Sequence, residues 1–188
     1  MRILLIFFLL LSSQSFAVDF VSEKKALKLL QDAPKTLDLQ GAREAQALAL
    51  DILKKTIEQN TWSAGFIADN AIFKRLHSRL AKANMIIELP HDKLRFCDEN
   101  TMAYAFGHIG NNVYLCLRAL KQPIEIVAQI IIHESAHFVV GTNECRATNL
   151  EVLAMMNSDL PYAIKNGYWD RCKILRFQQR VSRYMSEK

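Results

Sequence analysis

The sequence predicts a single α+β domain that is mainly helical and carries a small antiparallel hairpin or sheet. Three observations predict it. Apolar residues recur at helical spacing over much of the chain, two alternating segments flank a Gly-Asn-Asn turn, and a His-Glu-x-x-His motif lies within a long apolar helix. The 188 residues are 51% hydrophobic and 23% charged, as is typical of one globular domain.

The first 17 residues have the features of a secretory leader. One arginine precedes the unbroken apolar run Ile3–Leu11, and small residues precede a cleavage site before Val18. The run is too short to span a bilayer. We therefore expect residues 18–188 to form one mature, monomeric domain that is secreted or periplasmic and not inserted in a membrane. Residues 18–84 would be its helical N-terminal part and residues 85–188 the part that carries the motif.

The charge of the mature chain argues against a nucleic-acid partner. Removing the leader removes only Arg2, so the 24 basic residues become 23 against 19 acidic ones, a net charge of +4. A nucleic-acid binder would show a larger and more clustered excess. The densest basic run, from Arg171 to Arg183, is interpreted as the solvated face of a helix.

Four cysteines follow the leader, and an even number in an exported chain indicates disulfides. Three pairings are possible. We expect Cys97 to pair with Cys116, because these two bracket a predicted hairpin, and Cys145 to pair with Cys172. The sequence contains no Cys-x-x-Cys spacing, so a zinc finger is not supported.

The N-terminal part is predicted to form helices that carry no candidate catalytic or metal-binding residues. Apolar residues follow one helical face from Ala45 to Ile57 and again from Ala68 to Leu80. We expect these helices to support the rest of the domain. His77 lies among basic residues and is interpreted as a surface side chain.

Short strands are predicted next. Met85–Leu89 is a strand candidate that Pro90 ends, and residues 101–106 and 112–117 flank a turn at Gly110. These last two segments predict an antiparallel hairpin.

Three more helices follow the hairpin. Pro123 opens a long apolar helix that Gly141 ends near Val140, and Thr142 or Asn143 can cap the next helix. That second helix is expected from Glu144 to Asn157, and a last one from Asp170 to Met185.

The His-Glu-x-x-His motif in the apolar helix predicts a zinc site. Residues four apart share a helical face, so His133 and His137 can both direct an imidazole at one Zn²⁺, while Glu134 can reach a metal-bound water. Three polar groups in apolar surroundings would be costly without partners, which a metal supplies. The alternative is a pair of hydrogen-bonded core histidines, with Glu134 pairing one of them.

Two glutamates compete for the place of the third ligand. Glu144 and Glu151 are seven residues apart on the next helix and therefore share a face. We favour Glu144, because it directly follows the turn after the motif. The alternative for Glu144 is an acid that the helix dipole stabilises. Glu151 is the reserve ligand, or it orients a histidine from behind.

These residues resemble the deuterolysin-type, or aspzincin, metalloendopeptidases over roughly Cys97–Asn149. The resemblance rests on a cysteine-bracketed hairpin and on a Gly-Thr-x-acid element after His-Glu-x-x-His: Cys97-Asp98-Glu99, Ala103-Tyr104-Ala105, Val113-Tyr114-Leu115-Cys116, Gly141-Thr142-Asn143-Glu144. The acid is Glu rather than Asp, the gap before Gly141 is shorter, and Ala147 replaces the family's tyrosine. Glu144 and Ala147 also resemble the Glu-x-x-Ala stretch of gluzincin-like peptidases.

The resemblance implies a zincin-like catalytic domain with one Zn²⁺ per chain, bound by His133, His137 and Glu144, and with Glu134 as the general base. It implies an exported metalloendopeptidase that cleaves protein or peptide substrates, with the strand Val113–Leu115 as the edge that pairs with substrate. The oxyanion donor is left open among four residues: Tyr104, His108, Tyr162 and Tyr168. Two alternatives stay open, a peptidoglycan-peptide hydrolase with the same metal centre and a non-catalytic binding module.

Overall fold

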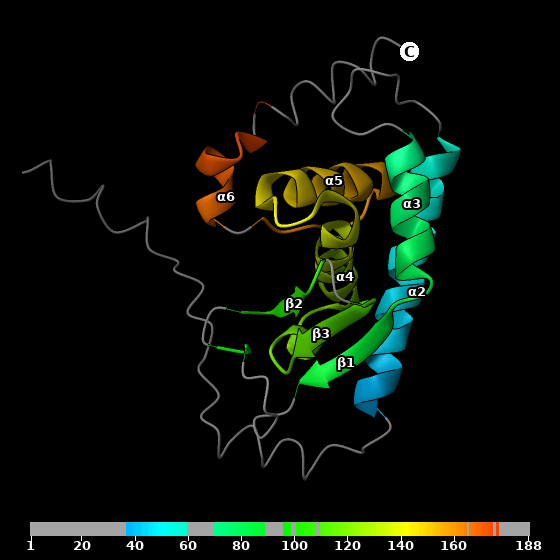
Figure 1. The fold of residues 1–188 in the computed structure, drawn as a ribbon, viewed down its shortest axis with the longest axis vertical. Coiled ribbons are helices and arrows are strands. Elements are labelled where there is room, and N and C mark those ends of the chain that lie inside the picture. Colours follow the sequence, from blue (N-terminus) through cyan, green and yellow to red (C-terminus); the bar gives the residue numbers. More distant parts are fainter. Residues whose placement is uncertain are drawn as a thin grey trace, which may run out of the picture.

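The computed structural model describes residues 37–59, 70–88, 96–98, 101–107, 110–164, 166–174 and 176. The predicted leader and the end of the predicted last helix lie outside these residues. The elements, in chain order, are α2 (Leu37–Glu58), α3 (Asn70–Leu80), β1 (Asn84–Glu88), β2 (Ala103–Ala105), β3 (Asn112–Cys116), the 3-10 turn η1 (Ala119–Lys121), α4 (Ile124–Val140), α5 (Glu144–Ser158) and α6 (Asn166–Arg171) (Figure 1).

The predicted fold class is confirmed at the coarse level, because the described residues are mainly helical and carry one small sheet. The hairpin is also confirmed. β2 pairs antiparallel with β3, and Gly110 at the turn has a φ of 81°. A positive φ of this size is the backbone conformation that glycine adopts without strain.

The sheet itself is mixed rather than antiparallel, which corrects the prediction. Its strand order is β1-β3-β2, and β1 runs parallel to β3. The chain reverses once before β2 and once after it, so β3 returns in the direction of β1. β3 therefore lies in the middle of the sheet, and Val113–Leu115 cannot be the free edge that was expected. The edge strand beside α4 is β2.

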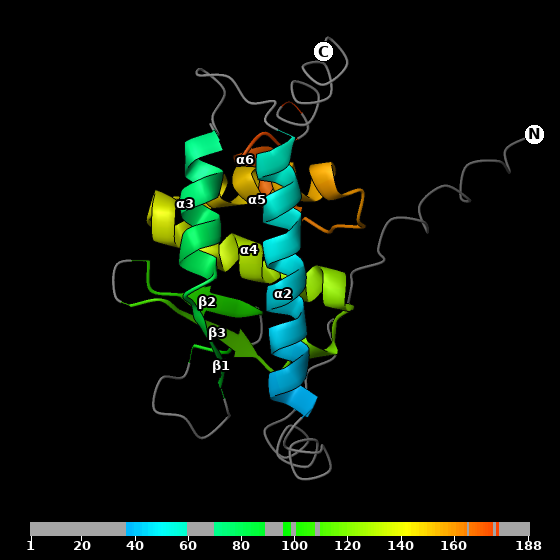
Figure 2. The same ribbon diagram turned by 90° about the vertical axis from the view of Figure 1, so that its right-hand side faces the viewer.

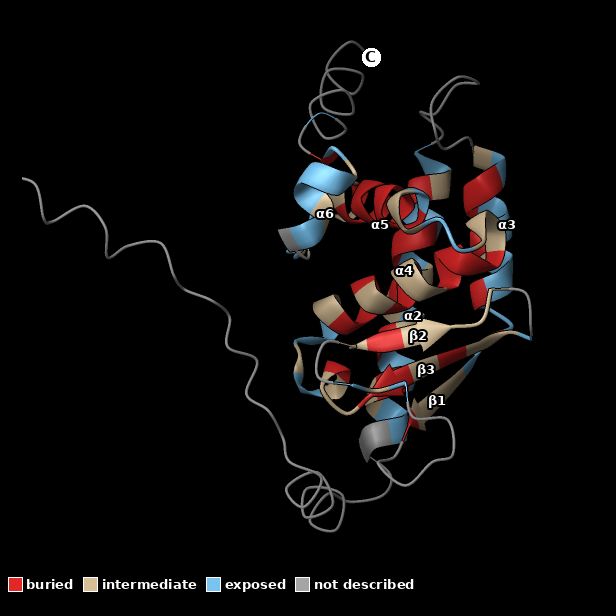
Figure 3. Ribbon diagram, turned by 60° about the vertical axis from the view of Figure 1, so that its left-hand side comes forward, coloured by how far each residue is buried: buried red, intermediate tan, exposed pale blue. Residues whose placement is uncertain are grey.

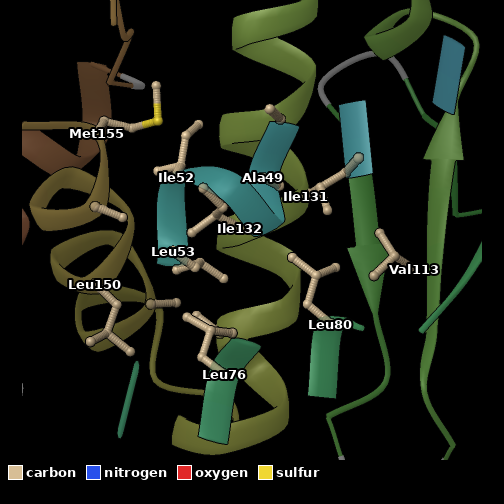
Figure 4. Packing of buried hydrophobic residues seen from close by; sticks show 14 of the residues in the cluster. Ala49, Ile52, Leu53, Leu76, Leu80, Val113, Ile131, Ile132, Leu150 and Met155 are labelled. Atoms are coloured by element: carbon tan, nitrogen blue, oxygen red, sulfur yellow. The ribbon is translucent and has the colours of Figure 1, made fainter. Parts of the chain in front are cut away.

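A layered packing positions α4 at the centre of the molecule. Figure 1 shows the sheet on one side of α4 and α5 on the other, with α2 and α3 alongside, and Figure 2 shows the same helices turned by 90°. Ile131 and Ile132 of α4 are fully buried. They belong to the same core cluster as Ile52 of α2, Leu76 of α3 and Leu150 of α5, and these side chains surround α4 in Figure 4.

The turn between α4 and α5 brings the second helix back against the first. Gly141 ends α4 with a φ of 65°, and the Asn143 side chain accepts the backbone N–H of Arg146 at 3.0 Å, which caps α5. Both ends agree with the sequence, which left the cap open between Thr142 and Asn143. The burial colours of Figure 3 show α4 and α5 as the most buried helices and α6 as a more exposed one.

The last helix begins earlier than the sequence predicts. α6 spans Asn166–Arg171, and the expected helix from Asp170 is interrupted. Lys173 has a φ of 54°, a left-handed conformation that breaks a right-handed helix just after Arg171. Beyond the described residues the predicted helix stays a prediction.

Both predicted disulfides are present. Cys97 is bonded to Cys116 and Cys145 to Cys172, with Cα atoms 5.4 and 5.0 Å apart. The first bridge ties the segment before β2 to the end of β3, and the second ties the start of α5 to the residue after α6. Among the described helices, none has the length and apolar character needed to cross a membrane.

Candidate metal centre

Two adjacent helices bring three potential metal ligands together. α4 presents His133 and His137 on one face, and the first residue of α5, Glu144, lies opposite them. Nε2 of His133 is 3.3 Å from Oε2 of Glu144, and Nε2 of His137 is 3.5 Å from Oε1 of the same carboxylate. One ligand atom from each residue lies within 4.8 Å of the other two. The group His133, His137 and Glu144 could therefore hold a metal ion.

The Nδ1 atom of each imidazole, on the side away from Glu144, makes a hydrogen bond of its own. Nδ1 of His133 lies 2.7 Å from Oε2 of Glu151, and Nδ1 of His137 lies 2.6 Å from the carbonyl oxygen of Gly141. A carbonyl and a carboxylate can only accept, so each Nδ1 carries the proton and donates it. Both Nε2 atoms face the same point as Glu144, so a metal ion there would take the place of any proton on Nε2. This is the arrangement that metal-binding histidines use, and it fits a metal better than it fits two core histidines.

The two competing glutamates have separate places. Glu144 lies on the Nε2 side of both histidines, and its side chain is 44% exposed. Glu151 lies on the Nδ1 side of His133, and its side chain is only 9% exposed. Of the two glutamates, Glu144, which the sequence favoured, therefore belongs to the group that could hold a metal, and Glu151 contacts the far nitrogen of His133.

The electrostatics of this group favour a positive charge at its centre. Burial disfavours the imidazolium form of His133, but its hydrogen bonds with Glu144 and Glu151 outweigh burial and raise the pKa of His133 to about 10. The same contact with His133, supported by Tyr168, lowers the pKa of Glu144 to about 2. Carboxylates gathered in this way stabilise a proton or a cation between them.

The side chain of Glu134 extends from α4 toward the edge strand of the sheet, β2. Its carboxylate accepts a hydrogen bond from the backbone of Ala105, the last residue of β2, and it interacts electrostatically with His133 and Glu144. Burial raises the pKa of Glu134 to about 7. The predicted base is thus a half-buried carboxylate beside the potential ligands, and the backbone of β2 holds it in place through a hydrogen bond.

The chain just after β2 packs directly on the turn of α4 that carries His137. A Cβ atom at Gly107 would lie 2.6 Å from the carbonyl oxygen of His137. Real Cβ atoms do not approach a backbone oxygen so closely, so this position requires glycine. The contact holds the end of the edge strand beside the histidines.

Tyr168 is the candidate oxyanion donor that the structure brings to the site. Its hydroxyl donates to Oε2 of Glu144 at 2.9 Å, and its ring lies 6.1 Å from that of His133. Burial raises its pKa to about 12, helped by the bond to Glu144, so the phenol stays protonated. The guanidinium of Arg171 lies over the Tyr168 ring, 4.7 Å from its centre.

Two of the other candidates, Tyr104 and Tyr162, are not brought to the metal group. Tyr104 stacks on Tyr114 with ring centres 4.7 Å apart, on the face of the sheet opposite to Ala103 and Ala105, which face the core. Tyr162 packs against the hydrophobic core. His108 lies outside the described residues. A signal for Tyr168 was present in the sequence: Cys172 follows it by one helical turn and was expected to bond to Cys145, the neighbour of Glu144.

Sequence reasoning missed Gln129. It lies on α4 four residues before His133, and only 3% of the residue is exposed. Its side-chain amide contacts the carboxylate of Glu151 and the backbone of Ala163. The available signal was a lone amide in an apolar helix, spaced to lie on the same face as both histidines.

The Cys145–Cys172 bridge should stabilise metal binding as well as the fold. It holds α6, which carries Tyr168, against the residue next to Glu144. We expect a variant with both cysteines replaced by serine to lose about 2–4 kcal/mol of stability and to bind metal more weakly. Denaturant unfolding and competition with a metal-binding dye measure the two effects.

The matched control for that variant replaces Cys97 and Cys116 instead. That bridge lies at the sheet, away from Glu144, so its removal should lower stability without a comparable loss of metal affinity. Equal metal affinities in the two variants would contradict a role of the second bridge at the site.

Comparisons of the chain with protein-family models, with curated proteins and with solved structures give no match.

Proposed function

We propose that the protein is an exported, zinc-dependent metalloendopeptidase with a zincin-like site, similar to the aspzincin peptidases. The observation that carries the proposal is the convergence of two Nε2 atoms and one carboxylate, with each Nδ1 anchored to an acceptor. Glu134 lies beside this group, and β2, the edge strand of the sheet among the described residues, ends next to it.

The donor set favours zinc among the common metals. Two imidazole nitrogens and one carboxylate are typical ligands of catalytic Zn²⁺, whose sites use three protein ligands and keep one position open. His133, His137 and Glu144 would hold the ion. Bound there, it would polarise the substrate carbonyl and lower the pKa of a coordinated water.

Glu134 has the position of a general base. Its carboxylate accepts the proton of the attacking water and passes it to the nitrogen of the leaving group. The hydrogen bond from Ala105 keeps the carboxylate turned toward the end of β2, where the scissile bond would lie. Tyr168 offers a protonated phenol on the Glu144 side, and its single O–H would turn from Glu144 to donate to the developing oxyanion.

The edge strand β2 offers backbone groups for an extended peptide. The N–H of Cys116 donates to the carbonyl of Met102, and in this antiparallel register Tyr104 also bonds toward β3. The backbone groups of Ala103 and Ala105 therefore point away from the sheet. Ala105 N–H is used by Glu134, which leaves the N–H and C=O of Ala103 and the C=O of Ala105 to pair with substrate.

Metal removal tests the proposal. The purified protein should contain about one zinc per chain and should hydrolyse an unfolded protein such as casein. A chelator should abolish hydrolysis, and added zinc should restore it. Elemental mass spectrometry and a casein assay measure the two properties.

The same experiment separates the competing functions. Release of fragments from purified cell walls without cleavage of casein would indicate a peptidoglycan-peptide hydrolase with the same centre. Bound zinc without turnover on either substrate would indicate a binding module. A folded protein that takes up no zinc would contradict the metal centre itself.

A further inference from the structure

We propose that Gln129 is a positioning residue that sets the ring orientation of His133 through Glu151. The inference rests on the proposed metal centre and extends it to a residue that touches neither metal nor substrate. Gln129 is buried one helical turn before His133, and its side-chain amide lies between Glu151 and the segment that leads to α6.

The contacts form one continuous chain of hydrogen bonds. Nε2 of Gln129 donates to Oε1 of Glu151, and Oε2 of the same carboxylate lies 2.7 Å from Nδ1 of His133. On its other side, the amide of Gln129 pairs with the backbone of Ala163: Nε2 donates to the carbonyl, and Oε1 accepts the N–H at 2.9 Å.

The direction of the bonds that Gln129 makes follows from Ala163, and the direction of the bond between His133 and Glu151 follows from the carboxylate, which can only accept. A backbone N–H can only donate, so it must face Oε1 of Gln129, and Nε2 must then face the carbonyl of Ala163 and Glu151. Glu151 therefore receives a donor at one oxygen and stays free to accept at the other. His133 must donate from Nδ1, and its Nε2 lone pair points to the metal position.

This chain also joins the metal centre to the connection between α5 and α6. Ala163 lies in that connection, and Tyr168, five residues later, donates to Glu144 on the opposite side of His133. The segment is thus attached both to the carboxylate that orients His133 and to the carboxylate that completes the ligand group. A metal ligand on α4 is held in place by the backbone of a segment 30 residues further along the chain.

Gln129→Met tests the inference, because methionine fills a similar volume without the amide. We expect the zinc dissociation constant, measured by competition with a zinc-binding dye, to rise by about 10- to 100-fold, as is usual when a group that orients a ligand is removed. In the zinc-loaded protein, the NMR signal of the His133 Nδ1–H should shift. That of His137, whose Nδ1 donates to Gly141, should not.

Gln46→Met is the matched control. Gln46 is a half-buried glutamine whose Nε2 also donates to two acceptors, the backbone carbonyls of Leu80 and Ala83, both at 3.0 Å and away from the metal group. Its replacement should lower the melting temperature without changing zinc affinity. If Gln129→Met behaves in the same way, with wild-type zinc affinity, the inference is overturned.

A double-mutant cycle shows whether Gln129 acts through Glu151. In a Glu151→Ala background, Gln129→Met should cause little further loss of zinc affinity, whereas fully additive losses would overturn the inference. If Gln129→Met does not fold, Gln129→Asn, which keeps the amide but is one methylene shorter, is measured against the same two outcomes. A folded wild-type chain that binds no zinc would overturn the proposed function, and this inference with it.

Discussion

Replacing Glu134 with glutamine should lower kcat/KM for peptide hydrolysis by roughly 10²- to 10⁴-fold, the usual contribution of a general base. Glutamine has nearly the same shape as glutamate, and its Oε1 can still accept the hydrogen bond from Ala105. It cannot accept the proton of the attacking water. The zinc content and the melting temperature should therefore stay close to those of the wild type, so that only the chemical step is lost.

Glu125→Gln provides the control for this variant. Glu125 lies in the first turn of the same helix, two turns before the motif, and makes no contact with the potential ligands among the described residues. Its replacement removes one half-buried carboxylate from α4, two helical turns from the motif, and should leave hydrolysis within about twofold. Hydrolysis at the wild-type rate by Glu134→Gln would mean that another group serves as the base.

Features that depend only on residues close together in the sequence were predictable. The ends of α4 and α5 follow from Gly141 and Asn143, whose backbone and side chain have local functions that hardly depend on the rest of the fold. The histidine pair was predictable for a similar reason, because a spacing of four residues places two side chains on one face of any α-helix.

The parts that depend on how elements are placed in space were not predictable. Alternation in Val113–Leu115 identifies the buried face of a strand but not its neighbours, so a central strand was taken for an edge. Gln129 was missed for a related reason. Its partners, Glu151 and Ala163, are 22 and 34 residues away, and only packing brings them together.

The two glutamates of α5 show both what local spacing predicts and what only the packing of the helices decides. A separation of seven residues places Glu144 and Glu151 on one face, and the sequence favours Glu144 only because it directly follows the turn, with Glu151 as the alternative. The offset of α5 along α4 decides between them, because it places one carboxylate at the Nε2 atoms and the other at Nδ1 of His133. This offset depends on the Gly141 turn and on core packing, for example of Leu150.

Replacing Glu144 with alanine should therefore weaken zinc binding more than replacing Glu151. Glu144→Ala removes a direct donor, and Tyr168, the nearest hydroxyl, is neutral and cannot replace the negative charge. We expect the zinc dissociation constant to rise by more than ~100-fold. Glu151→Ala leaves all three donors but frees the ring of His133, so a smaller rise of about 10- to 100-fold is expected. Dye competition and zinc content per chain measure both variants.

Glu144→Asp separates the charge of this carboxylate from its reach. Aspartate keeps the negative charge but is one methylene shorter, and it is the acid found at this place in the family that the motif resembles. Zinc affinity should fall less than in Glu144→Ala, because the turn at Gly141 holds the start of α5 close to both histidines. If Glu151→Ala instead loses zinc while Glu144→Ala retains it, then Glu151 is the ligand, and α5 must slide along α4 when the metal binds.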